Sequence, residues 1–129
     1  MNKNDKMLKE VIDLINRMKS TRPLVECLTN RVTINDCANM LLAMGASPIM
    51  AEIECEMEEI MNISSALVIN LGLLDGTYLS AMKTAAEAAK RLGKPIVLDP
   101  VGAGASKLRD ETCREMIELT KPDIIRGNM

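Results

Sequence analysis

The chain has 129 residues, 47% of them hydrophobic, and its 16 basic and 18 acidic side chains give a net charge of −2. That length suits one domain with one sizeable core, and the lack of a basic surplus argues against nucleic acid as a partner. The sequence has no His, Phe or Trp. The core is therefore expected to be aliphatic, and catalysis by Ser-His-Asp or Cys-His groups of these 129 residues is excluded.

The first 50 residues predict a helix, a strand, a second helix and a second strand. Asn4 or Asp5 caps the first helix, which the segment 20–23 ends. Its apolar residues follow helical spacing: Leu8, Val11, Ile12, Leu14, Ile15 and Met18. The next three elements are a strand at 24–28, a helix at about 34–44 with Ala38, Leu41 and Leu42 on one side, and a strand at 47–50. Gly45 ends the second helix, and Pro48 makes the second strand either an edge strand or only an extended segment.

The second half begins with a dense run of acid, which we interpret as a solvated helix or loop face rather than a cation site. These residues are Glu52, Glu54, Glu56, Glu58 and Glu59. The segment 66–72 is the strongest strand signal in the chain. A helix opens at Asp75 or Thr77 and runs to about Leu92, where Gly93 stops it. The remaining elements are a strand at 96–98, a helix that Asp110 caps and that runs through Leu119, and a strand at 124–125.

Strands and helices alternate throughout, without a linker or repeat. This alternation predicts an α/β fold in which β-α-β units form a parallel sheet with right-handed crossovers and helices on both faces. We expect residues 1–129 to form a single α/β domain.

Polar residues follow four of the expected strands. They are Thr29-Asn30, Asn70 to Gly72, Asp99 to Gly104, and Arg126 to Asn128. Because the carboxyl ends of parallel strands meet at one edge of a sheet, we expect these groups to converge there. The carboxylate of Asp99 suits Mg²⁺, the guanidinium of Arg126 suits a phosphate, and the amides of Asn30 and Asn70 suit a small polar group.

Each of these residues also has a structural interpretation. Asp99 would cap its own loop, and Asn30 would close an Asx-turn. Asn70 would be a hydrogen-bonded strand end, and Arg126 would pair with a surface carboxylate. Neither a P-loop nor a Gly-x-Gly-x-x-Gly dinucleotide motif is present.

Cysteine usage and hydropathy bear on location. Cys27, Cys37, Cys55 and Cys113 are scattered and form no Cys-x-x-Cys pair, which favours structural thiols in a reducing cytoplasm. No apolar run approaches the roughly 20 residues that a membrane-spanning helix needs, so we expect no membrane partner.

Five segments together resemble the hydroxyethylthiazole kinase family. They are Pro23-Leu-Val-x-Cys-Leu-Thr-Asn30, Ala38-Asn-x-Leu-Leu-Ala-x-Gly-Ala-Ser-Pro-Ile-Met50, Ser65-Ala-Leu-Val-Ile-Asn-Leu-Gly72, Pro95-Ile-Val-Leu-Asp-Pro-Val-Gly-Ala-Gly-Ala105 and Ile125-Arg-Gly-Asn128. The resemblance implies a ribokinase-like fold and transfer of the ATP γ-phosphate to the hydroxyl of 4-methyl-5-(2-hydroxyethyl)thiazole in thiamine salvage. It also implies trimers with the thiazole pocket at subunit boundaries.

The resemblance assigns roles to individual residues. Asn30 and Met50 would line the thiazole pocket, Asp99 would help to hold Mg²⁺ near the phosphates, and Arg126 would contact ATP. Gly45, Gly72 and Asn128 match the family pattern and would have shaping roles. Two residues depart from it, because Glu26 stands where these enzymes often carry His and Arg31 follows Asn30 where a neutral residue is common.

Length is the larger departure, because enzymes of this family are roughly twice as long. We interpret the chain as an amino-terminal half that lacks the later glycine-rich catalytic segment, so no catalytic residue is predicted within it. We expect such a half to be poorly stable or self-associating, and not competent alone. The alternatives are a non-catalytic half-domain that binds or assembles with a second chain, and a stand-alone flavodoxin-like domain for another phosphate compound.

Overall fold

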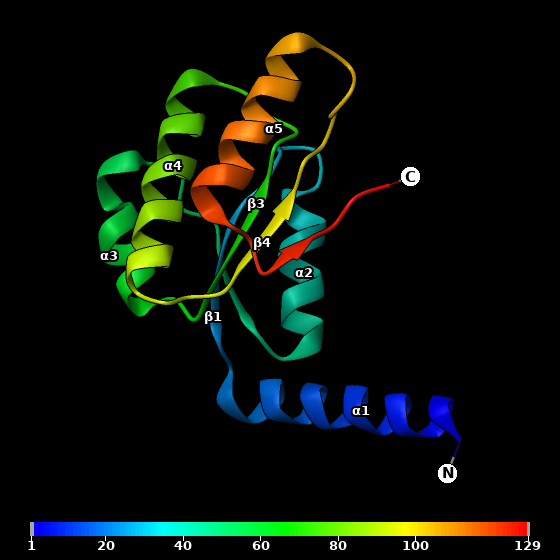
Figure 1. Cartoon of the computed structure of the whole chain (residues 1–129). Coiled ribbons are helices and arrows are strands. Elements are labelled where there is room, and N and C mark those ends of the chain that lie inside the picture. Colours follow the sequence, from blue (N-terminus) through cyan, green and yellow to red (C-terminus); the bar gives the residue numbers. More distant parts are fainter. Residues whose placement is uncertain (1, 129) are drawn as a thin grey trace.

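The computed structural model describes residues 2–128, which form a parallel sheet with the strand order β2-β1-β3-β4-β5 (Figure 1). The strands are β1 (Leu24–Leu28), β2 (Ser47–Ile49), β3 (Ala66–Asn70), β4 (Ile96–Asp99) and β5 (Ile124–Ile125). The helices are α1 (Lys3–Thr21), α2 (Ile34–Met44), the 3-10 helix η1 (Glu54–Glu56), α3 (Met57–Ile63), α4 (Gly76–Arg91) and α5 (Lys107–Thr120). The predicted α/β class with a parallel sheet is confirmed.

Helices cover the two faces of the sheet unequally. α3, α4 and α5 lie on one face, α2 lies on the other, and α1 extends away from the sheet beyond α2 (Figure 1). The chain leaves β1 towards β2 at one edge, whereas it leaves β3 towards β4 and β5 at the other. The order therefore reverses between β1 and β3, which is the point where open α/β sheets place ligands.

A larger core cluster fills the face beneath α3, α4 and α5. Leu28, Leu67, Ile69 and Leu98 contribute from the sheet, and all four side chains are buried. Alanines line the inner side of α4 and let that helix approach closely: Ala81, Ala85, Ala86, Ala88 and Ala89. Methionines fill the remaining space: Met57, Met61, Met82 and Met116. The expected aliphatic core is confirmed.

A smaller core cluster lies on the face that α2 covers. It consists of Val25, Cys27 and Ala46, with Leu41 and Val68 packed against it. α2 packs on β2, so the far end of the same sheet face has no helix over it. Ile124, on that end, is 57% exposed.

Two predicted helix caps are wrong. Asn2, not Asn4 or Asp5, caps α1, and Asp5 instead completes a capping box with it. Ser106, not Asp110, caps α5. The Asp110 carboxylate accepts a hydrogen bond from the Gly104 backbone N–H at 2.6 Å. The true cap lies three residues before Asp5 in α1 and four residues before Asp110 in α5. Both aspartates also suit a helix start, so the sequence alone did not distinguish them from the caps.

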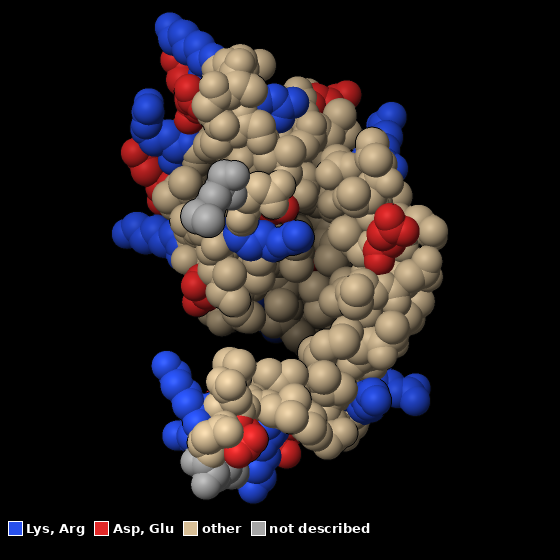
Figure 2. All heavy atoms as spheres, turned by 90° about the vertical axis from the view of Figure 1, so that its right-hand side faces the viewer, with Lys and Arg blue, Asp and Glu red and all other residues tan. Residues whose placement is uncertain are grey.

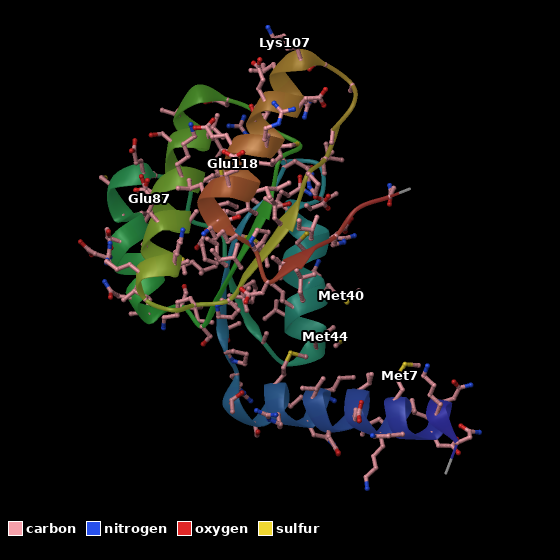
Figure 3. The ribbon with its side chains drawn as sticks, viewed as in Figure 1. Met7, Met40, Met44, Glu87, Lys107 and Glu118 are labelled. Carbon is pink, nitrogen blue, oxygen red and sulfur yellow. The ribbon has the colours of Figure 1, made fainter. Side chains whose placement is uncertain are left out.

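The apolar residues of α1 form the expected helix, but the described chain does not bury them. Leu8, Val11, Ile12 and Leu14 are exposed. Leu42 of α2 is also exposed, although Leu41 beside it packs on the smaller core cluster. Figure 2 shows a hollowed and largely uncharged surface between α1 and the rest of the molecule, and Figure 3 shows Met7 on α1 and Met40 and Met44 on α2 on that side.

Most of the acidic run lies in η1 and at the start of α3. The sequence predicts a solvated face without deciding between a helix and a loop. Glu54, Glu58 and Glu59 are exposed, and Glu58 pairs with Arg91 of α4. Met57 and Met61 face the larger core cluster from the same segment. Along residues 2–128, no group of three or more acidic or Cys side chains is arranged to hold a metal ion. None of the described helices combines the length and the apolar character that crossing a membrane requires.

Glu26 carries an ionisable carboxyl group into the sheet, where the neighbouring buried side chains are mostly apolar. It lies in the middle of β1 and is fully buried. One oxygen, Oε2, accepts a hydrogen bond from the Ala51 backbone N–H at 3.4 Å, and Oε1 has no partner among the described residues. Burial, with a smaller contribution from the nearby Glu56, raises the pKa of Glu26 from 4.5 to about 8. The side chain is therefore a neutral acid near pH 7.

We predict that Glu26 makes stability fall with rising pH. The unfolded chain releases this proton near pH 4.5 and the folded chain near pH 8, so the contribution of Glu26 to stability is largest below pH 4.5 and is lost as the pH rises to 8. This contribution to the free energy of unfolding should decrease by up to about 5 kcal/mol over that window. Urea unfolding at a series of pH values measures it. Glu26→Gln should flatten the dependence and the exposed Glu52→Gln should not, and equal slopes in the wild type and Glu26→Gln would contradict the prediction.

We also predict that the isolated chain self-associates, because β5 has an unpaired edge whose Ile124 and Ile125 are 57% and 53% exposed. Light scattering after size exclusion should give a mass above 14.2 kDa. Ile125→Lys should lower that mass, since a charged edge strand resists pairing. Ile63→Lys, an equally exposed position on α3, should not. A monomer with a cooperative thermal transition would count against the prediction.

Candidate functional site

Three side chains at the carboxyl edge of the sheet form a hydrogen-bonded row across β1, β3 and β4. Asn30 Nδ2 donates to Asn70 Oδ1 at 3.1 Å, and Asn70 Nδ2 donates to Asp99 Oδ2 at 3.2 Å. The strand register places Asn70 directly beside Asp99. The convergence expected from the sequence is therefore present, and it lies where the order of the sheet reverses.

Asn30 has two tasks at the end of β1. Its Oδ1 accepts from the backbone N–H groups of Val32 and Thr33 at 3.0 and 3.1 Å, which is the Asx-turn considered from the sequence. Its Nδ2 is left to reach Asn70 on the neighbouring loop. The turn therefore orients the amide that makes the link between strands. The Asx-turn interpretation of Asn30 is confirmed, and its contact with a small polar ligand stays a prediction.

Asp99 does not cap its own loop with its side chain. The backbone carbonyl of Asp99 closes that turn by accepting from Val101 N–H at 2.9 Å. The Asp99 side chain, 15% exposed, is instead held by Asn70 and faces Arg126, whose Nη1 lies 3.7 Å from Asp99 Oδ2. The Arg126 side chain is 74% exposed, so this ion pair contributes little stability and leaves the guanidinium available to another anion.

A hollow of about 650 Å³ opens beside this pair. Its walls are the turn after β4 and the segment that follows β5: Asp99, Pro100, Val101, Gly102, Ala103, Ile125, Arg126, Gly127 and Asn128. Gly102 and Gly104 adopt φ values of +81° and +86°, which only glycine takes without strain. One carboxylate and one guanidinium are thus the charged groups that border a hollow otherwise lined by uncharged residues.

Met50 lies elsewhere. It directly follows β2 and packs, partly buried, against the smaller core cluster. The structure brings Asn30, Asn70, Asp99 and Arg126 together, and it does not bring Met50 into this row or into the hollow. Asn30 also lies outside the lining of the hollow.

The donors near Asp99 fit Mg²⁺ better than a metal that needs a complete protein cage. Mg²⁺ is usually bound through one or two carboxylates, with water and substrate phosphates completing its six ligands. Asp99 offers one largely buried carboxylate, and its hydrogen bond with Asn70 and its ion pair with Arg126 both involve Oδ2. If Mg²⁺ bound at this edge, Asp99 would hold the ion, which would supply positive charge to a phosphate ligand.

Two residues that support the site were not found from the sequence. Tyr78, the one aromatic residue of the chain, is buried on α4 and its hydroxyl donates to the Thr29 carbonyl at 2.6 Å, which fixes the end of β1. Arg109 on α5 donates to backbone carbonyls of two loops. A buried tyrosine in an aliphatic core needs a partner for its hydroxyl, which was a usable signal. The position of Arg109 offered none.

Comparison with known proteins gives consistent matches. The model of the hydroxyethylthiazole kinase family matches residues 15–129. A hydroxyethylthiazole kinase from Methanobrevibacter smithii is 46% identical over all 129 residues, which cover 45% of that protein. One from Clostridium beijerinckii is 49% identical over 116 residues, 90% of this chain and 42% of that protein.

A solved structure agrees with these matches. The hydroxyethylthiazole kinase protein from Pyrococcus horikoshii superposes with a TM-score of 0.89 at 47% identity, covering 94% of this chain and 47% of that one. The chain therefore spans a little under half the length of these relatives.

We predict that Asn70→Asp, which is nearly isosteric, destabilises the edge. The new carboxylate still accepts from Asn30 and Gly72 but has no N–H for Asp99, and it places two negative charges side by side. The expected loss is about 1–3 kcal/mol in urea unfolding, partly recovered by Mg²⁺. Asn39→Asp, the same change at an exposed position of α2, serves as the control. An Asn70→Asp chain as stable as the wild type in the absence of Mg²⁺ would refute the row as a stabilising unit.

Proposed function

Because the chain belongs to the hydroxyethylthiazole kinase family, we propose that it forms part of an enzyme that phosphorylates 4-methyl-5-(2-hydroxyethyl)thiazole on its hydroxyl group with ATP. That reaction is a salvage step of thiamine biosynthesis. The observation that carries the proposal is the row from Asn30 through Asn70 to Asp99, beside Arg126, within a chain that matches the family from residue 15 onwards.

The proposed roles follow the chemistry of each side chain. Asp99 helps to hold Mg²⁺ and Arg126 binds ATP through its phosphates, so the two opposite charges that border the hollow both serve the nucleotide. The transfer of a phosphoryl group depends mainly on positioning and on neutralising phosphate charge. The guanidinium of Arg126 supplies positive charge directly, and Asp99 would do so through the Mg²⁺ that it would hold. Asn30 and Met50 bind the thiazole.

The separation of Met50 from the row fits a pocket built from more than one copy of the chain. Met50 lies on the α2 face, and α1 and α2 carry the exposed apolar residues of the hollowed surface in Figure 2. A second copy covering that surface would bring further groups towards Met50. We therefore propose a trimer whose thiazole pockets lie at subunit boundaries.

The four cysteines are free thiols, which supports a cytoplasmic location.

The proposed roles of the described residues are binding and positioning, and none of them is assigned as the base for the thiazole hydroxyl. The relatives are about twice as long, which supports the proposal that 129 residues are not competent alone. The second candidate is a non-catalytic half-domain that assembles with another chain. The exposed edge of β5 and the exposed apolar residues of α1 favour this half-domain. The experiment described next distinguishes it from part of an active kinase.

The test measures ADP formation with ATP, Mg²⁺ and hydroxyethylthiazole. We expect no turnover by the 129-residue chain, and thiazole-dependent turnover by a chimaera that joins it to the part of the Pyrococcus horikoshii kinase that it does not cover. In the chimaera, Asp99→Asn should lower kcat about 100-fold to 1,000-fold, because the charge that holds the metal is lost. Arg126→Gln should raise the KM for ATP about tenfold.

Matched controls lie on the outer faces of the helices. Glu87→Gln on α4 and Arg114→Gln on α5 change the same charges at exposed positions, and both should leave turnover unchanged (Figure 3 shows Glu87). Turnover by the 129-residue chain alone would show that nothing essential is missing. A chimaera that folds but has no thiazole-dependent activity would favour the half-domain.

A further inference from the structure

Arg109 connects the two loops that carry the candidate site. It lies in the first turn of α5 and is half-buried. Its Nη1 donates to the carbonyls of Leu71 at 3.0 Å and Val101 at 3.1 Å, and its Nη2 donates to the carbonyl of Gly72 at 3.3 Å. One guanidinium therefore holds the loop after β3 and the loop after β4 together.

The two loops are shaped around this side chain. A Cβ on Gly102 would lie 2.6 Å from Arg109 Cδ, and the backbone there has a φ of +81°. The loop after β4 thus folds directly onto the arginine. Only a planar fork with several N–H donors reaches three carbonyls in different directions, whereas a lysine offers one nitrogen at one point.

The clamped carbonyls are next to the residues of the row. Leu71 and Gly72 follow Asn70, and Val101 is two residues after Asp99. The Gly72 N–H also donates to Asn70 Oδ1 at 2.9 Å, so movement of that loop displaces the amide that holds Asp99. Because Arg109 turns its nitrogens towards backbone, its effect on a ligand passes through Asn70 and Asp99.

We propose that Arg109 is a positioning residue, which fixes the spacing of the β3 and β4 loops so that Asp99 keeps its place at the nucleotide end of the site. The inference rests on the proposed function for what the site binds. The clamp itself is a property of the described residues, and it is tested separately.

The first test is amide hydrogen exchange, followed by mass spectrometry, on the 129-residue chain. Arg109→Lys keeps the positive charge but loses the planar guanidinium. Arg109→Ala leaves a space in which a small guanidinium compound can bind. Exchange in the segments 71–74 and 101–105 should rise about tenfold in both variants, with β1 and β3 unchanged. Ethylguanidinium should restore protection to Arg109→Ala, whereas ethylammonium at the same concentration should not. Arg114→Lys, exposed on the same helix, is the control.

The outcomes separate the clamp from the function. Unchanged loops in Arg109→Lys, or exchange that rises equally in all elements, would overturn the positioning role, because the residue would then be dispensable or a general stabiliser. In the active chimaera, Arg109→Lys should lower kcat/KM for MgATP about tenfold more than Arg114→Lys does. Loosened loops with unchanged MgATP kinetics would overturn the link to Asp99. An inactive chimaera whose loops still respond as expected would place the failure in the proposed function and leave the clamp standing.

Discussion

The pairing of Asn70 with Asp99 across β3 and β4 is the contact on which the arrangement of the site depends. Parallel register sets these residues side by side, and an amide there has the donor that a carboxylate needs and the acceptor that Asn30 needs. A carboxylate at position 70 would repel Asp99, and an aliphatic side chain would join neither neighbour. The amide is therefore the group that converts three separate strand ends into one polar row.

Most of the secondary structure was predictable because local signals and tertiary context agree. β1 and α2 have the expected bounds, Pro48 does lie in an edge strand, and Gly45 ends α2 in the left-handed conformation. The caps of α1 and α5 were misplaced because Asp5 and Asp110 are good helix-starting residues that serve as partners inside the first turn. The apolar stripe of α1 predicted a helix correctly, but periodicity does not say what will cover the stripe.

The candidate site was predictable to the extent that strand topology determines it. Parallel strands bring Asn30, Asn70, Asp99 and Arg126 to one edge whatever their side chains do. The burial of Tyr78 indicated that its hydroxyl needs a partner, but the particular carbonyls that Tyr78 and Arg109 bind were not predictable, because both residues reach the site from helices. Backbone carbonyls occur at every residue, so the sequence does not mark which one a side chain will meet. The buried carboxyl of Glu26 was likewise hidden within an otherwise ordinary strand.

A glycine-bearing loop at a sheet edge suggests that the backbone approaches a ligand closely. At this edge Gly72 and Gly102 instead make room for other side chains of the same chain. A Cβ on Gly72 would lie 2.8 Å from Asn70 Oδ1 and 3.1 Å from Asn30 Nδ2, and one on Gly102 would meet Arg109 at 2.6 Å. Both glycines thus leave room for side chains of the chain itself. The Asn30 to Asn70 contact needs the first space, and the Arg109 clamp needs the second. Close approach of backbone to a ligand is consequently not required to explain these two positions. The proposed binding at this edge therefore rests on Asp99 and Arg126 and does not depend on the two glycines.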